Sequence, residues 1–237
     1  MRINLMVILT CLGFLGLSSV ALAGGNVAVV VVDVQGDFTT AHKGSLAVDG
    51  TDEAFLKTVA QATADLKKAG LPIYATQDWH PADHMSFAAN NEGKKPFETL
   101  KLKDGRVQVM WPVHCVQGSA GAELLLDKSL FTKVIQKGTD SNYDSYSGFK
   151  DDGGAKTGLD KTLKDAGIKT LIVYGIATDY CVKATVMDGL AAGYKVVVIQ
   201  NLCRGVAPET SEAAWAEMKK AGAELWPSLD LAKVKSL

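Results

Sequence analysis

This chain contains little proline and little cysteine, and neither positive nor negative charge is in excess. Its 237 residues include 6 Pro and 4 Cys, and 25 Lys and Arg residues nearly balance 26 Asp and Glu residues. So little proline excludes a Pro-rich linker array, and the balanced charge provides no basic surface for a nucleic acid partner. Hydrophobic residues make up 47% of the chain, a composition that predicts one globular domain.

The first 23 residues have the pattern of a secretory signal peptide. Arg2 precedes an apolar run over residues 5–17, and the triplet A-L-A that ends at Ala23 matches a small-residue cleavage site. We expect cleavage after Ala23, a mature domain over residues 24–237, and a periplasmic or secreted protein with no stable membrane anchor. The alternative is a retained anchor, for which the apolar run is short.

Three cysteines, Cys115, Cys181 and Cys203, remain in the mature chain. An exported protein that is stabilised by disulfides normally carries an even and larger number of cysteines. Three is an odd number, so at least one thiol is unpaired. A domain of this size can fold without cross-links, which suggests that a free thiol is retained for its chemistry. The alternative is a small buried hydrophobic residue.

Short apolar runs alternate with amphipathic helical segments along the chain. The runs cover residues 27–34, 72–77, 133–137, 170–175 and 195–200. Helical spacing from Phe55 to Leu66 predicts a helix that stops at Gly70, and further helices are predicted over residues 159–166, 179–192 and 211–221. This rhythm predicts an α/β fold, a three-layer α/β/α arrangement around a mainly parallel sheet. The long loops over residues 78–120 and 138–156 are expected to carry function.

Reactive side chains follow four of the predicted strands. In chain order they are Asp33, Asp78, Lys137 and Cys181. Open parallel sheets bind ligands beyond the carboxyl ends of their strands. We therefore expect these four side chains to converge on one site.

Cys181 is the candidate nucleophile. It lies at the start of a predicted helix, where free N–H groups and the helix dipole favour a thiolate. The same N–H groups could hold an oxyanion, so the site suits attack on a carbonyl carbon. Asp33 and Lys137 could move protons beside the thiol. The alternatives are a packed cysteine and an ordinary salt bridge.

A candidate metal site follows the second strand. Asp78 and His80, two residues apart on an extended segment, point to the same side, and His84 can return from the next turn. His114 supplies a third imidazole, so three of the four histidines of the chain are involved. One carboxylate and three imidazoles suit a divalent zinc, iron or manganese ion. The alternative is a set of surface histidines in a loop.

Five segments carry a family resemblance. They are V-D-V-Q-G-D-F over residues 32–38, D-W-H-P over 78–81, W-P-V-H-C over 111–115, D-S-Y-S-G-F over 144–149 and G-I-A-T-D-Y-C-V over 175–182. Together they resemble the nicotinamidases (pyrazinamidases) of the isochorismatase-like cysteine hydrolases, across residues 26–226. Two positions depart from the commonest pattern, Gly36 where asparagine is usual and Tyr180 where several members have histidine.

The resemblance implies an activity. It implies hydrolysis of nicotinamide, and of pyrazinamide, to the acid and ammonia through a cysteine thioester, with one divalent metal ion binding the pyridine nitrogen. The small aromatic amide is then the partner of the site. A monomer and a homo-oligomer are both compatible with the sequence.

The resemblance also implies a role for each site residue. Asp33, Lys137 and Cys181 would form the catalytic triad, and the N–H groups of Ala177 and Cys181 would form the oxyanion hole after a cis peptide at Ile176-Ala177. Phe38, Trp111 and Tyr146 would line the ring pocket. Asp78, His80, His84 and His114 would surround the metal.

Two other functions stay open from the sequence. The first is another carboxamide or carbamoyl hydrolase of the superfamily, although members without pyridine substrates generally lack the metal motif. The second is a metal-binding or thiol-redox protein without turnover. That protein would not need Asp33 and Lys137, and the chain has no C-x-x-C motif.

Overall fold

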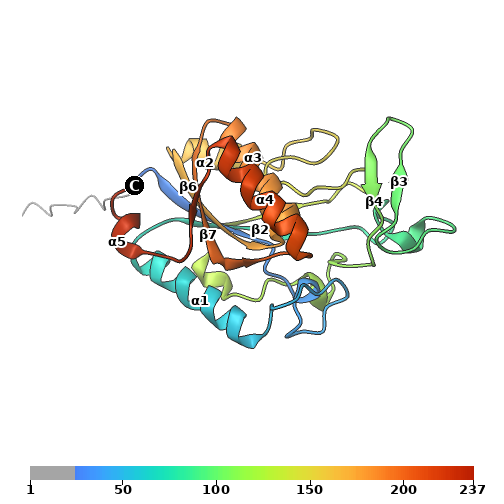
Figure 1. The fold of residues 1–237 in the computed structure, drawn as a ribbon, viewed down its shortest axis with the longest axis horizontal. Coiled ribbons are helices and arrows are strands. Elements are labelled where there is room, and N and C mark those ends of the chain that lie inside the picture. The colour runs from blue at the N-terminus through green and yellow to red at the C-terminus, as the bar shows by residue number, and fades with distance from the viewer. Residues whose placement is uncertain (1–24) are drawn as a thin grey trace, which may run out of the picture.

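The computed structural model describes residues 25–237 (Figure 1). The predicted signal peptide and its cleavage site after Ala23 lie outside the described residues. Within residues 25–237, no helix has both the length and the apolar character needed to cross a membrane.

A six-stranded parallel sheet forms the middle layer. Its strands are β1 (Val27–Val32), β2 (Ile73–Asp78), β5 (Lys133–Lys137), β6 (Thr170–Ile176), β7 (Lys195–Arg204) and β8 (Glu224–Trp226). They are arranged in the order β5-β2-β1-β6-β7-β8, with parallel pairing throughout. Each residue of β1, β2 and β6 is buried, which explains the continuous apolar runs. The predicted α/β fold with a mainly parallel sheet is confirmed.

Helices cover both faces of this sheet. They are α1 (Glu53–Lys68), α2 (Leu159–Asp165), α3 (Lys183–Ala191), α4 (Pro208–Ala221) and the short α5 (Leu231–Val234). Figure 1 shows α1 on one face and α2, α3 and α4 on the other. The α1 helix begins where the Asp52 side chain accepts a hydrogen bond from the Phe55 N–H, and it buries Phe55, Val59 and Leu66 against the core.

Several elements differ from the sequence-based boundaries. The predicted helix over residues 179–192 is divided into a π-helical turn, Thr178–Val182, and α3. The α4 helix begins at Pro208, because proline suits a first helical turn.

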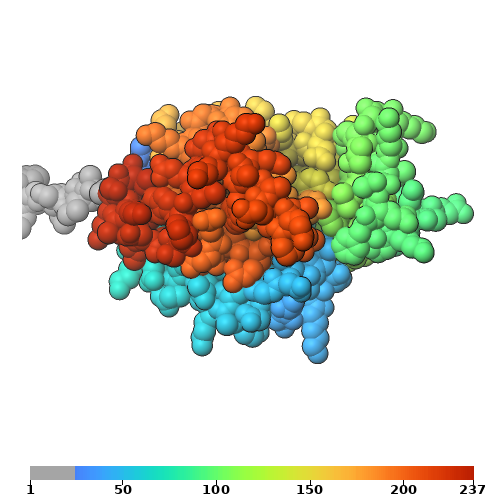
Figure 2. Space-filling view, viewed as in Figure 1, coloured from blue at the N-terminus to red at the C-terminus, as the bar shows by residue number. Residues whose placement is uncertain are grey.

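The predicted loop over residues 78–120 contains a short hairpin, formed by β3 (Thr99–Lys101) and β4 (Val107–Val109). This part of the chain, green in Figure 2, projects from the body of the molecule. Single 3-10 turns occur at Gly36–Phe38, Ala88–Asn90, Ala120–Ala122 and Lys128–Leu130.

The sheet brings the predicted reactive residues to one edge. Asp33 follows β1 directly, while Asp78 and Lys137 are the last residues of β2 and β5 and pair in register. The β6 strand approaches β1 so closely that a Cβ on Gly175 would lie 2.0 Å from the Val32 carbonyl oxygen. Only glycine fits at this approach. The Ile176-Ala177 peptide that follows is cis, as the resemblance implied.

Asp179, in the π-helical turn, ties this edge to the start of α4. Its carboxylate accepts hydrogen bonds from the N–H groups of Val206 (2.9 Å) and Ala207 (3.3 Å) and from the Thr210 hydroxyl (2.5 Å). Ala207 occupies the N-cap position of α4 but has no side-chain acceptor. Asp179 therefore satisfies polar groups that the helix start cannot satisfy locally.

Asp179→Ala is expected to lower the free energy of unfolding by about 1–3 kcal/mol, because it leaves three partly buried donors without this acceptor. Urea denaturation measures the change. Asp165→Ala is the matched control, since Asp165 forms only an exposed i,i+4 ion pair with Lys161 and should cost less than about 0.5 kcal/mol. Equal costs for the two substitutions would contradict the assignment.

Candidate active site

The Lys137 ammonium lies at the centre of a buried polar site. Its Nζ is 3.0 Å from Asp33 Oδ2, 2.5 Å from Asp78 Oδ1 and 3.5 Å from Cys181 Sγ, and it donates to the Ser145 carbonyl oxygen at 2.6 Å. The three predicted triad residues, Asp33, Lys137 and Cys181, are all buried. The structure thus brings together residues that are up to 148 positions apart in the chain, from Asp33 to Cys181.

The two carboxylates of this site have opposite pKa shifts. Burial raises the pKa of Asp33 to about 6, although Lys137 and a 2.6 Å hydrogen bond from Thr76 act to lower it. Burial also acts to raise the pKa of Asp78, but the positive charge of Lys137 and the neighbouring His80 ring outweigh it and hold that pKa well below its usual range. Asp33 is therefore suited to accept and return a proton, and Asp78 to stay ionised.

The surroundings of the Cys181 thiol favour its protonated form. Burial raises its pKa well above the ordinary value, the carboxylates of Asp33 and Asp78 raise it further, and Lys137 alone lowers it. These surroundings oppose the thiolate that the start of a helix was expected to favour. An Asp33 carboxylate oxygen lies within 4.8 Å of Sγ, so an acceptor for the thiol proton is close. Cys115, Cys181 and Cys203 are all buried and unpaired.

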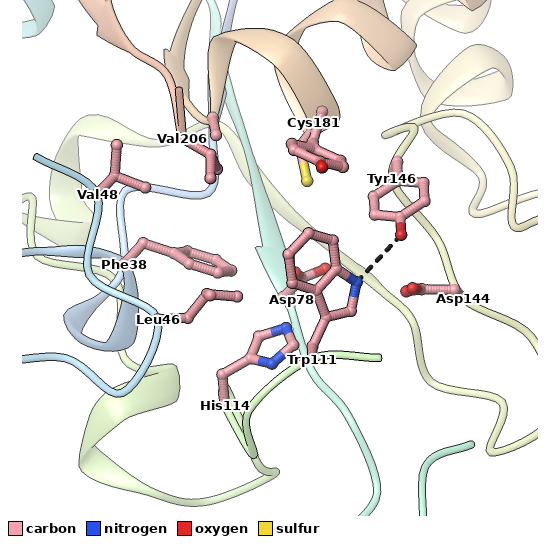
Figure 3. A pocket seen from close by; sticks show the side chains of 12 residues that line it. Phe38, Leu46, Val48, Asp78, Trp111, His114, Asp144, Tyr146, Cys181 and Val206 are labelled. Carbon is pink, nitrogen blue, oxygen red and sulfur yellow. Dashed lines mark hydrogen bonds between the residues drawn. The ribbon is translucent and has the colours of Figure 1, made fainter. Parts of the chain in front are cut away.

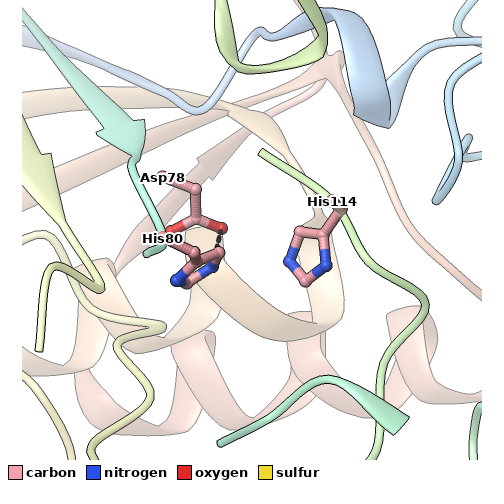
Figure 4. A group of neighbouring side chains, drawn as sticks. All are labelled: Asp78, His80 and His114. Carbon is pink, nitrogen blue, oxygen red and sulfur yellow. Dashed lines mark ion pairs between the residues drawn. The ribbon is translucent and has the colours of Figure 1, made fainter. Parts of the chain in front are cut away.

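Three predicted metal ligands form a cluster. Asp78, His80 and His114 each place a ligand atom within 4.8 Å of the other two (Figure 4). The Nδ1 atoms of the histidines lie 2.9 Å from the Gly138 carbonyl and 2.8 Å from the Pro112 carbonyl, respectively. Since a carbonyl oxygen can only accept, each Nδ1 carries the proton and each Nε2 is left as a ligand.

One atom of this cluster indicates a cation directly. His80 Nε2 is buried, lies 3.6 Å from Asp78 Oδ2 and has no hydrogen-bond partner among the described residues. A buried nitrogen with a free lone pair beside a carboxylate is well matched to a metal ion. One carboxylate and two imidazoles suit a borderline divalent ion with further positions left for other ligands.

His84, the fourth predicted metal residue, lies beside this cluster and outside it. Its ring packs on the His80 ring with a centroid separation of 4.2 Å. Nε2 donates to the Tyr143 carbonyl at 3.1 Å, and Nδ1 accepts from the Ser86 hydroxyl at 2.8 Å. Direct ligation by His84 would require one of these bonds to break, and its role stays a prediction.

A pocket adjoins the thiol. Cys181 and His114 lie on opposite sides of it (Figure 3). The three predicted ring-binding residues, Phe38, Trp111 and Tyr146, all line it, and the Trp111 indole N–H donates to the Tyr146 hydroxyl at 3.1 Å. Ala177, predicted to share the oxyanion hole with Cys181, also lines the pocket. Its role there stays a prediction.

Other residues of the pocket were not assigned from the sequence. Leu46, Val48 and Val206 add an apolar side, and the Tyr180 ring packs edge-on against Trp111 at 5.0 Å. Asp144 adds a buried carboxylate. The only signal for Tyr180 and Asp144 was their place within the quoted motifs, while the three aliphatic residues lie in loops whose course the sequence does not define.

A family model, that of the isochorismatase domain, matches residues 27–228. The chain belongs to the isochorismatase family. It is 46% identical over 209 residues to the nicotinamidase of Escherichia coli (strain K12). The alignment covers 86% of this chain and 95% of the relative.

Solved structures agree with this family membership. A nicotinamidase and pyrazinamidase of Acinetobacter baumanii superposes with a TM-score of 0.77 at 41% identity, covering 85% of this chain and 95% of that one. A pyrazinamidase of Pyrococcus horikoshii in complex with zinc gives a TM-score of 0.70 at 34% identity, covering 85% and 98%. The chain is an amidohydrolase that acts on carbon–nitrogen bonds.

Gly138 provides a test of the metal site. It has φ +63°, and an added Cβ would lie 2.3 Å from His80 Cε1. Gly138→Ala should therefore displace the ring and weaken Zn²⁺ binding by at least about tenfold, measured by competition with a chromophoric chelator. Gly154→Ala is the matched control, because Gly154 also has a positive φ, +91°, but nothing lies within 4 Å of its added Cβ. Unchanged binding by Gly138→Ala would disprove the assignment.

Proposed function

We propose that this chain is a nicotinamidase that hydrolyses nicotinamide, and pyrazinamide, to the acid and ammonia. The observation that carries the proposal is one aromatic-lined pocket with a thiol on one side and a metal-ligand cluster on the other. A substrate with a carboxamide and a ring nitrogen can meet both groups at once. The names of the relatives support the same substrates.

The first half of the reaction forms a thioester. Asp33 accepts the proton of the Cys181 thiol, and Sγ attacks the carboxamide carbon. The N–H groups of Ala177 and Cys181 stabilise the oxyanion. Lys137 compensates the negative charge shared by Asp33 and the sulfur. Asp33 then returns its proton to the amide nitrogen, the carbon–nitrogen bond breaks, and ammonia leaves.

The second half releases the acid. Asp33 takes a proton from water, the water oxygen attacks the thioester carbon, and the carbon–sulfur bond breaks as Cys181 regains its proton. Trp111, Tyr146 and Phe38 hold the ring between them throughout. Asp78, His80 and His114 would hold a divalent ion. When bound, that ion supplies a Lewis acid that binds and orients the pyridine nitrogen.

Purified protein loaded with Zn²⁺ or Mn²⁺ is expected to release ammonia from nicotinamide, monitored by a coupled assay. Cys181→Ala should lower kcat/KM by at least about a thousandfold, because the nucleophile is removed. Cys203→Ala is the matched control, since Cys203 is also buried but lies in β7 and outside the pocket residues, and it should keep its activity. Equal activity of the two variants would rule out the thioester mechanism.

The pH dependence of kcat/KM should reflect the ionisation of Asp33. Only the ionised carboxylate can accept the thiol proton, so kcat/KM should fall as the pH drops below about 6, the raised pKa of Asp33. The expected loss is about tenfold per pH unit. The profile is measured at saturating metal, with the bound metal quantified at each pH. A flat profile down to about pH 4, the ordinary range of a carboxylic acid, would contradict the role of Asp33.

A further inference from the structure

Asp144 is a buried carboxylate of the pocket that the reaction above does not use. It is 4% exposed and lines the pocket together with Asp78 and His114 (Figure 3). Two hydrogen bonds fix it: the Gln108 side-chain amide donates to Oδ2 at 2.7 Å, and the Ser145 N–H donates to Oδ1 at 2.9 Å. A buried carboxylate is costly unless a positive charge compensates it.

The metal-ligand cluster shares its pocket with Asp144, because Asp78, His114 and Asp144 all line that pocket. Asp144 is not among the three residues whose ligand atoms lie within 4.8 Å of one another. It is therefore near the cluster without being a member of it.

The net charge of the buried site explains why a further carboxylate would be needed there. In their charged forms Asp33, Asp78 and Lys137 together carry one negative charge, and a divalent ion would leave the buried site with one positive charge. The carboxylate of Asp144 supplies the missing negative charge. The orphaned Nε2 of His80 independently indicates that a cation belongs at the cluster.

We propose that Asp144 is an outer-sphere carboxylate of the metal site. It holds the divalent ion by its charge, and it accepts hydrogen bonds from water on the ion without touching the ion itself. Gln108 and Ser145 orient it for this purpose. The inference rests on the proposed function, because the ion at Asp78, His80 and His114 is part of that function.

Zn²⁺ affinity measured by chelator competition tests this role. Asp144→Asn keeps the shape of the side chain and removes its charge, and it should weaken Zn²⁺ binding by about tenfold or more. Asp144→Glu keeps the charge and should recover part of that loss. Asp152→Asn is the matched control, because Asp152 is exposed but close, with its N–H donating to the Asp144 carbonyl, and it should change the affinity by less than about threefold.

Thermal melting of the metal-free proteins separates a charge effect from a folding defect. If Asp144→Asn does not fold, Gln108→Leu serves instead, since it keeps the charge and removes the donor that orients it; Zn²⁺ binding should weaken severalfold. Wild-type affinity in whichever of these variants folds overturns the proposal. A wild-type protein that binds no Zn²⁺ or Mn²⁺ overturns the metal site of the proposed function as well, so the two failures are distinguishable.

Discussion

The ammonium of Lys137, shared between two buried carboxylates, is the interaction on which the site depends. Charges of this kind cost several kcal/mol each when they leave water, so they persist only with close partners. The sheet order provides those partners, because β5, β2 and β1 are neighbours. Lys137 and Asp78 end β5 and β2, and Asp33 directly follows β1 at the same edge. Strand pairing alone thus joins the thiol side of the pocket to the metal-ligand side.

The position of this shared cation explains why the two aspartates of the site have different pKa values. Asp78 lies 2.5 Å from Lys137 and close to His80, and these neighbours favour its ionised form. Asp33 is fully buried and lies 3.0 Å from Lys137, so burial dominates and it keeps a proton affinity near neutral pH. In the proposed reaction, this difference lets Asp33 accept the proton of the Cys181 thiol while Asp78 stays ionised.

The sequence predicts much of this arrangement, because buried parallel strands produce continuous apolar runs, and Asp33, Asp78 and Lys137 lie at the ends of three of these runs. It does not predict the π-helical turn around Cys181, since helical spacing over residues 179–192 is the same for one helix or two. The three-residue strands of the β3–β4 hairpin are too short for periodicity. The raised pKa of the Cys181 thiol and the burial of Asp144 beside the pocket depend on distant segments, which only the folded chain brings together.

The most direct test of this account is the free energy of unfolding of Lys137→Met at neutral pH. Removing one partner leaves Asp33 and Asp78 buried without their cation, so a loss of about 3–5 kcal/mol is expected. Lys133→Met, on the same strand but exposed, is the control and should cost less than about 1 kcal/mol. A Lys137→Met protein as stable as the wild type would contradict the claim that this ammonium holds the site together.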